Sequence, residues 1–190
     1  MDQQVDAALV HAIAAELGSS WRANIDPQHR WGASIERPAD RARLWVVFRD
    51  GKIEVSGSFP QGRDGYTYGP RDPRRIGCSP SRGARAIARD IQRRFLSWYE
   101  EEYANAVQRR DESERQLAWR DATIQELAET LETEVYHPHG RSSEPRVHVN
   151  YRGLYGNVEV SPYNQTVKIE LSGIPVDLAH QILTIIREGA

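Results

Sequence analysis

The clearest pattern in the chain is a helical repeat of apolar and basic positions between residues 81 and 107. Apolar side chains recur at intervals of three or four residues, which places them on one helix face: Ile87, Ile91, Phe95 and Trp98. Four arginines recur at the same intervals, and at about 100° per residue they fall on the opposite face. We name them the arginine row: Arg82, Arg85, Arg89 and Arg93. Ser79 or Ser81 can cap this helix, and Pro80 fits its first turn.

Beyond residue 107 the helical pattern lapses and then returns. The stretch 108–116 is polar, and an apolar stripe resumes afterwards at Leu117, Ile124, Leu127, Leu131 and Val135. Either one helix of about fifty residues runs through this stretch, or a turn near 110–113 folds it into a helical hairpin. We favour two helices, because the apolar spacing lapses and because Ser113 could cap a second helix with Gln116 at the capping-box position.

A helix and three strands precede the arginine row. Apolar residues at every fourth position predict a helix over 3–17, which Gly18 ends. Alternating apolar and polar positions predict strands at about 31–37, 43–49 and 52–59. Asp50-Gly51, between the last two strands, is a strong hairpin signal.

The same order of elements recurs in the second half of the chain. Strand-like alternation appears at 147–151, 158–160 and 167–171, and a closing helix is predicted over 175–187. The sequence thus predicts an α+β fold of two units in pseudo-repeat, each a helix, a three-stranded antiparallel meander and a helix, joined through a long helix or a helical hairpin. The units span 1–107 and 108–190, as two domains or packed as one. We expect these core residues: Leu44, Val46, Phe48 or their alternates, Ile87, Ile91, Phe95, Ile124, Leu127, Leu131, Val149, Val158, Ile169 and Ile182.

Composition and charge change this picture in two ways. With 39% hydrophobic and 27% charged residues, no apolar run of roughly 20 residues and no signal-peptide pattern, we expect a cytoplasmic protein without a membrane partner. The net charge of −2 hides a strong asymmetry. Residues 61–99 hold nine arginines against three aspartates, whereas residues 100–134 hold eleven acidic residues against four arginines. Neighbouring stretches therefore carry opposite charge.

A long loop over residues 60–80, rich in Gly, Pro, Arg and Tyr, precedes the arginine row. Loops of this length are usually functional or disordered. Tyrosine rings can stack on bases and arginines can bind phosphates, so the loop and the helix together predict a nucleic-acid-binding surface. Its residues are Arg63, Tyr66, Tyr68, Arg71, Arg74, Arg75, Arg82, Arg85, Arg89 and Arg93. The alternative is a solvated loop that lies over the sheet.

Other candidate sites lack the groups that their chemistry needs. Cys78, the single cysteine, precedes a helix among arginines, which would lower the pKa of its thiol, but no base or oxyanion site accompanies it. His137 and His139 flank Pro138, whose extended backbone points the two rings apart, and His148 would be a third metal ligand. The glycine spacing of a P-loop or a dinucleotide site does not occur. We expect no metal, no cofactor and no enzymatic activity.

Two resemblances concern the arginine-bearing helix. The order α-β-β-β-α, with basic residues at the start of the last helix (here 81–89), resembles the double-stranded-RNA-binding domain, whose helix meets phosphates across the major groove. No residue role is carried over from it. The stretch from Ile76 to Tyr99 resembles uncharacterised proteins of actinobacterial phages and mobile elements, which implies an accessory protein of such an element.

Two functional hypotheses follow. The first is a non-enzymatic accessory protein of a phage or mobile element that binds DNA or RNA through the arginine row and the loop before it. The second is a protein–protein interaction module, such as an inhibitor of a host or competing system, because arginine also enriches protein interfaces. A homodimer is compatible with either. The acidic stretch separates the hypotheses, because it would neutralise the arginine row if it folded back onto it.

Overall fold

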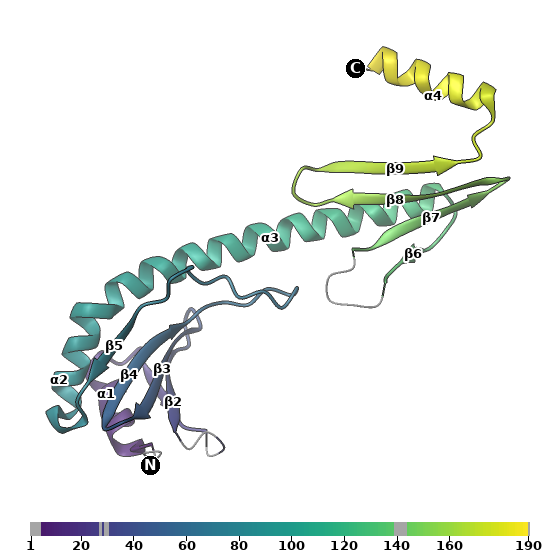
Figure 1. The fold of residues 1–190 in the computed structure, drawn as a ribbon. Coiled ribbons are helices and arrows are strands. Elements are labelled where there is room, and N and C mark those ends of the chain that lie inside the picture. Colours follow the sequence, from purple (N-terminus) through teal and green to yellow (C-terminus); the bar gives the residue numbers. More distant parts are fainter. Residues whose placement is uncertain (1–4, 27, 29–30, 139–143, 190) are drawn as a thin grey trace. The chain divides into compact units, whose positions relative to one another are not determined.

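The computed structural model describes residues 5–26, 28, 31–138 and 144–189. It is an α+β protein, in which helices accompany two antiparallel sheets (Figure 1). The chain divides into two compact units, an N-terminal unit (Met1–Asp111) and a C-terminal unit (Glu112–Ala190). Among the described helices, none combines the length and the apolar character that crossing a membrane requires.

The N-terminal unit is built on five antiparallel strands that pair in chain order. Helix α1 (Ala7–Leu17) leads into β1 (Arg22–Asn24), β2 (Gly32–Arg37), β3 (Ala42–Arg49), β4 (Lys52–Ser58) and β5 (Arg75–Cys78). A 3₁₀ turn, η1 (Pro80–Arg82), then leads into α2 (Gly83–Ile91), a π-helical turn, η2 (Gln92–Leu96), and α3 (Ser97–Thr130). The three predicted strands appear as β2, β3 and β4. The prediction of a three-stranded meander is nevertheless wrong, because β1 and β5, with three and four residues, are too short to show an alternating pattern.

The turn between β3 and β4 confirms the hairpin signal. Asp50 and Gly51 have φ angles of 52° and 71°, the left-handed values that a two-residue turn of this kind requires. The turn sets a register in which Val46 lies opposite Val55, and both side chains are buried. Since a one-residue slip would turn these side chains to the other face, the turn and the core specify the same pairing.

One face of the sheet forms the main core with the helices. Its fully buried side chains come from α1, the strands, α2 and the π-helical turn: Val10, Ile13, Ile35, Leu44, Val46, Ile53, Val55, Ile87, Ile91 and Phe95. The predicted apolar face of the arginine-bearing helix is therefore confirmed. Helix α1 begins at Ala7, because the Asp6 carboxylate accepts a hydrogen bond from the Leu9 N–H at 3.0 Å and caps the helix. Residues 3 and 4 of the predicted helix lie outside the described residues.

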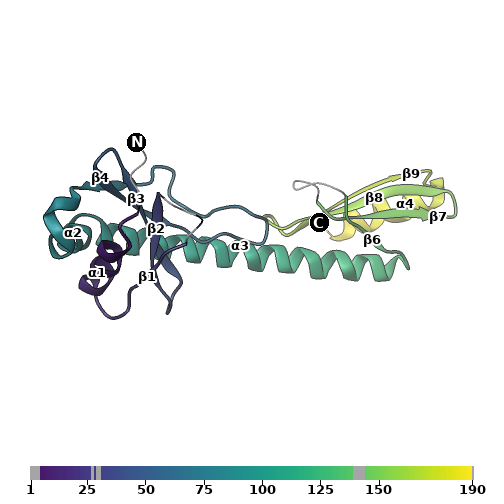
Figure 2. The ribbon, with the colours of Figure 1, turned by 90° about the horizontal axis from the view of Figure 1, so that it is seen from below.

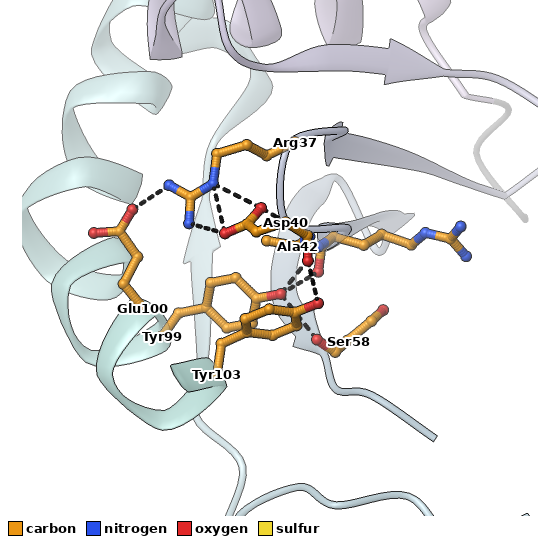
Figure 3. A network of polar contacts seen from close by, with 8 residues as sticks. Arg37, Asp40, Ala42, Ser58, Tyr99, Glu100 and Tyr103 are labelled. Carbon is orange, nitrogen blue, oxygen red and sulfur yellow. Dashed lines mark hydrogen bonds and ion pairs between the residues drawn. The ribbon is translucent and has the colours of Figure 1, made fainter. Parts of the chain in front are cut away.

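Tyr99 of α3 packs against the sheet at Gly57, a position that has no side chain. Its ring lies so close to Gly57 of β4 that a Cβ there would lie 2.3 Å from two ring carbons. Its hydroxyl accepts a hydrogen bond from the Arg43 N–H at 3.0 Å and donates one to the Ser58 carbonyl at 2.8 Å (Figure 3). Burial raises the pKa of this phenol, so it stays protonated and able to donate. Tyr99 therefore fixes both the height and the register of α3 over β3 and β4.

A second group of contacts ties the turn between β2 and β3 to the same part of α3 (Figure 3). Arg37 forms ion pairs with Asp40, at 2.8 Å between Nη2 and Oδ2, and with Glu100. Tyr103, one helical turn after Tyr99, donates a hydrogen bond from its hydroxyl to the Asp40 carbonyl at 2.9 Å. Two successive turns of α3 are thus held by the sheet.

The C-terminal unit packs the second part of α3 against four antiparallel strands. These are β6 (Val135–Tyr136), β7 (Arg146–Tyr151), β8 (Leu154–Ser161) and β9 (Thr166–Ser172), and α4 (Val176–Gly189) follows them. The buried core is small: Ile124, Ala128, Val147, Val158 and Val160. The prediction of three strands is wrong here as well. Val135, which we had assigned to the apolar stripe of the preceding helix, belongs to β6 and pairs with Val147. Sheets of four and five strands do not support the pseudo-repeat.

Several residues that we expected in the core of the C-terminal unit are not buried. Ile169 is 59% exposed and Leu131 is 41% exposed. Leu127, Val149 and Ile182 are half-buried. Their spacing identifies the apolar faces of the elements, but the described residues do not supply enough side chains to cover those faces.

The favoured helical hairpin near residues 110–113 is wrong, because α3 runs from Ser97 to Thr130 without a break. Neither Gly nor Pro occurs from residue 84 to residue 137. Within the polar stretch, Glu112 pairs with Arg115 at 2.6 Å and accepts a hydrogen bond from Gln116 at 3.0 Å. Pairs three and four residues apart stabilise a helix whose apolar stripe is interrupted.

The contact between Tyr99 and Gly57 leads to a stability prediction. Gly57→Ala should destabilise the N-terminal unit by about 1–3 kcal/mol, because the added methyl group overlaps the Tyr99 ring. Gly77→Ala in β5 is the matched control, since a Cβ there meets no heavy atom within 4 Å. Urea unfolding followed by tryptophan fluorescence measures both variants, because four of the five tryptophans belong to this unit. Equal unfolding free energies for the two variants would contradict the packing described for Tyr99.

Candidate nucleic-acid interface

The arginine row lies on the outer face of the helical segment formed by η1, α2 and η2. All four arginines of the row are exposed, and so is their neighbour Arg94. The opposite face of the same segment carries the fully buried Ile87 and Ile91. The burial of that face holds the guanidinium groups toward solvent, so the core does not use their charge.

Asp90 is a buried carboxylate at the centre of these arginines. Its residue is only 4% exposed. It forms ion pairs with Arg82, with Arg93 at 3.5 Å and with Arg94 at 3.9 Å. A buried carboxylate is tolerated only when it is paired in this way. Asp90 therefore holds three of the guanidinium groups in place and offsets only one of their charges.

Arg85 and Arg89 differ from the arginines around Asp90. Both are exposed, and neither has an ion pair or hydrogen bond to any residue that the structure describes. Together with Arg82, Arg93, Arg94 and Asp90 they leave a local charge of +4 on this surface. An anionic ligand could approach the two side chains without displacing an internal partner.

Most of the acidic stretch 100–134 belongs to helix α3, which runs without a turn from Ser97 to Thr130. Several of its carboxylates have partners outside the arginine row. Glu100 binds Arg37 of β2, while Glu112 and Asp121 bind Arg115 and Arg120 on α3 itself. The ion pairs of the arginine row with a described carboxylate are those with Asp90.

The loop between β4 and β5 contains a small hairpin that presents the predicted tyrosines. Gln61 and Thr67 form an antiparallel bridge. The Tyr66 and Tyr68 rings meet edge to face, with their centroids 5.0 Å apart. Tyr66 is 63% exposed, whereas Tyr68 is half-buried. The loop is thus locally structured, and one of its two rings is free to stack.

The structure does not bring this hairpin together with the arginine row. Arg109 of α3 donates a weak hydrogen bond to the Tyr68 carbonyl at 3.4 Å, which places the hairpin beside a residue twenty positions after Arg89. Figures 1 and 2 both show the loop between β4 and β5 extending away from α2. The ten predicted residues therefore form at least two separate surfaces.

The remaining loop arginines have different environments. Arg74 lies over the Trp98 ring, 5.3 Å from its centroid. Arg75 forms an ion pair with Glu54 of β4 at 3.0 Å. Both interactions fasten the end of the loop to the fold. Arg63 and Arg71 are exposed.

Sequence reasoning missed a groove that lies beside the hairpin. It has a volume of about 450 Å³, and its lining includes Arg41, Arg43, Gln61, Tyr103 and Arg110. The groove is formed where the turn between β2 and β3, the end of β4 and α3 meet. No local pattern could have indicated it, because its basic residues come from segments that are far apart in the sequence.

The environment of Cys78 raises the pKa of its thiol, whereas its position before a helix among arginines had suggested a lowered pKa. Cys78 is 4% exposed in β5. Burial, and then the negative charge of Asp90, raise the pKa of the thiol, and the opposing effects of Arg94 and Arg82 are smaller. The expected lowering of the pKa was wrong because burial of the thiol, together with the charge of Asp90, outweighs the effect of the nearby arginines. Cys78 is part of the core.

The histidines considered as metal ligands have other surroundings. Nδ1 of His148 lies 2.7 Å from the side-chain oxygen of Asn157, and its ring lies against Tyr136. Among the described residues no group of three or more His, Cys, Asp or Glu side chains is placed to hold a metal ion. His139 lies outside the described residues.

Comparison with known proteins identified no relative of this chain. No protein-family model, curated protein or solved structure matches the chain.

The burial of Cys78 leads to a prediction about its reactivity. In the folded protein the thiol should react with an aromatic disulfide reagent only as fast as the N-terminal unit opens, and at once in denaturant, because it is buried and protonated. Cys78→Ala combined with Ser79→Cys is the matched control, which moves the thiol to an exposed neighbour. Immediate stoichiometric labelling of the native wild-type protein would refute the assignment of Cys78 to the core.

Proposed function

We propose that the N-terminal unit binds nucleic acid through the arginine row on α2, by contacts to the phosphate backbone. The observation that carries the proposal is the presence of four exposed guanidinium groups on one helix face, with Asp90 as the carboxylate among them. A guanidinium group can hold a phosphate through two parallel hydrogen bonds. From Arg82 to Arg93 the helix rises about 16 Å, the length of about five base pairs of duplex.

The proposed contacts position a nucleic acid without reading its bases. Phosphate contacts carry no sequence information of their own. Binding should therefore vary little between oligonucleotides of different sequence and fall steeply with salt, as counterions are released. The proposed role is non-enzymatic.

The segment that bears the row also carries the resemblance to accessory proteins of phages and mobile elements. Residues 76–99 contain all four arginines of the row. We assign the binding role to this segment, and we place the protein among such accessory proteins as part of the same proposal.

Replacement of Arg85 and Arg89 tests the proposal. Arg85→Glu with Arg89→Glu should abolish binding to mixed-sequence duplexes and leave the melting temperature nearly unchanged, because both side chains are exposed and have no described partner. For the wild-type protein, four phosphate contacts predict a slope of log K against log salt of about −3.6. Arg85→Gln with Arg89→Gln should reduce the slope to about −1.8, since two of the contacts are lost. Fluorescence anisotropy between about 50 and 200 mM salt measures the affinity of each protein and its salt slope.

A matched control carries the same change of net charge on other helices. Arg115→Glu with Arg187→Glu reverses two exposed arginines in the C-terminal unit and should leave binding within a few-fold of wild type. If this control lost binding equally, the loss in the Arg85 and Arg89 variant would be explained by net charge and not by the arginine row. Absence of wild-type binding to duplex or single-stranded DNA and RNA at about 50 mM salt would reject the proposal in favour of a partner protein.

The tyrosine hairpin is proposed as a separate contact for unpaired bases. Tyr66→Ala should weaken binding to single-stranded oligonucleotides by about 1–3 kcal/mol, the usual effect of losing one stacking ring. It should leave duplex binding unchanged, because duplex bases are already stacked. Titration of both ligands with the same variant measures the difference, and equal effects on both would contradict a stacking role.

A further inference from the structure

The C-terminal unit exposes more apolar surface than its small core accounts for. In β9, Val167 and Ile169 are exposed. Helix α4 has no buried residue, and it exposes Val176, Leu183, Ile185 and Ile186 at 60–71% each. Exposed apolar side chains gathered on neighbouring elements of a folded protein are typical of an interaction site.

Strand β9 also offers backbone groups for pairing. In the sheet order β6-β7-β8-β9 its one neighbour is β8, so it forms an edge of the sheet. The outer edge of such a strand presents N–H and C=O groups to a further strand. Seven residues of β9 are extended and in register with β8, which gives an added strand a regular template.

The sequence of β9 is complementary to itself about Ile169. The strand reads Thr166-Val167-Lys168-Ile169-Glu170-Leu171-Ser172. If two copies pair antiparallel with Ile169 facing its own equivalent, Lys168 of each copy lies opposite Glu170 of the other. The same register places Val167 opposite Leu171 and the Thr166 hydroxyl opposite Ser172. In this register each charge thus lies opposite a charge of the other sign, each apolar side chain opposite an apolar one, and each hydroxyl opposite a hydroxyl.

Other antiparallel registers lack this complementarity. Centring the pair on Lys168 or on Glu170 puts like charges directly opposite each other. A shift by a single position puts apolar residues of one copy opposite polar residues of the other, because successive side chains point to opposite faces. The register centred on Ile169 is therefore the one that pairs Lys168 with Glu170 and keeps apolar residues opposite apolar residues.

We propose that the chain forms a two-fold symmetric homodimer in which the β9 strands of two copies pair antiparallel about Ile169. The two four-stranded sheets become one eight-stranded sheet, and the interface uses the same patch on both copies. Helix α4 follows β9 after the short link 173–175, which keeps its exposed apolar side chains within reach of the joined sheet. This proposal is independent of the arginine row, which belongs to the other unit.

The test exploits the charge pair on β9. The full-length wild-type chain should sediment as a dimer of twice 21.6 kDa. Lys168→Glu and Glu170→Lys should each weaken the dimer by at least about tenfold, because each brings like charges together twice across the two-fold axis. Lys52→Glu, at the other lysine of the chain, is the control of equal charge change and should leave the dimer intact.

Mixing the two variants separates an interface effect from an effect within one strand. Within one chain Lys168 and Glu170 already form an ion pair at 2.7 Å, and both variants lose it. In the mixture, however, the two carboxylates on β9 of the Lys168→Glu chain face the two ammonium groups on β9 of the Glu170→Lys chain. A heterodimer should therefore form with near wild-type affinity in native mass spectrometry. A monomeric wild-type chain at micromolar concentrations, unchanged dimers of both variants, or a mixture that stays monomeric would each overturn the proposal.

Discussion

The structure of the N-terminal unit depends on the place where Tyr99 meets Gly57. A ring can lie directly on the backbone of β4 because position 57 has no Cβ, and the buried hydroxyl then finds its partners at Arg43 and Ser58. Phe95 stacks on Tyr99, with centroids 5.7 Å apart and planes within 11° of each other. Helix α2 and η2 lead directly into this contact, so it continues the packed face that Ile87 and Ile91 begin. The arginine row lies on the other side of that face.

Asp90 shows how a buried charge can organise a surface. A carboxylate at this depth would be strongly unfavourable without partners, and three arginines supply them. Arg82 and Arg93 are held by this pairing, which lowers the conformational entropy that a ligand would have to remove. Arg85 and Arg89 keep their freedom and their full charge. The surface therefore combines guanidinium groups that are paired with Asp90 and guanidinium groups that have no described partner.

The two units differ in how completely their helices cover the apolar side chains of the sheet. In the N-terminal unit α1, α2 and the start of α3 cover one face of the sheet, and residues such as Ile35, Leu44 and Ile91 are fully buried. In the C-terminal unit α3 covers the middle of the sheet but leaves Ile169 exposed at its edge. Apolar side chains of β9 and α4 are then available to another molecule, which is a common reason for a small sheet to associate.

The sequence by itself determined the elements whose pattern is local. The four-residue spacing of Ile87, Ile91 and Phe95 predicted the buried helix face, and Asp50-Gly51 predicted the hairpin, because a helix face and a two-residue turn are set by neighbouring residues. It predicted the α+β class for the same reason. The short strands β1, β5 and β6 were beyond it, since pairing with a neighbouring strand decides them. The continuity of α3 was misjudged because the apolar stripe lapses at 108–116, although local polar pairs such as Glu112 with Arg115 continue the helix there.

Only the tertiary structure decided which side chains work together. The separation of Tyr66 from Arg89, the pairing of Asp90 with Arg82 and the raised pKa of Cys78 all depend on distances between residues that are apart in the sequence. The groove at Arg41 and Arg110 is another case. Periodicity reports the direction of a side chain relative to its own helix or strand. Which residue lies in that direction depends on how the elements pack. The contact of Tyr99 on α3 with Gly57 on β4 is an example.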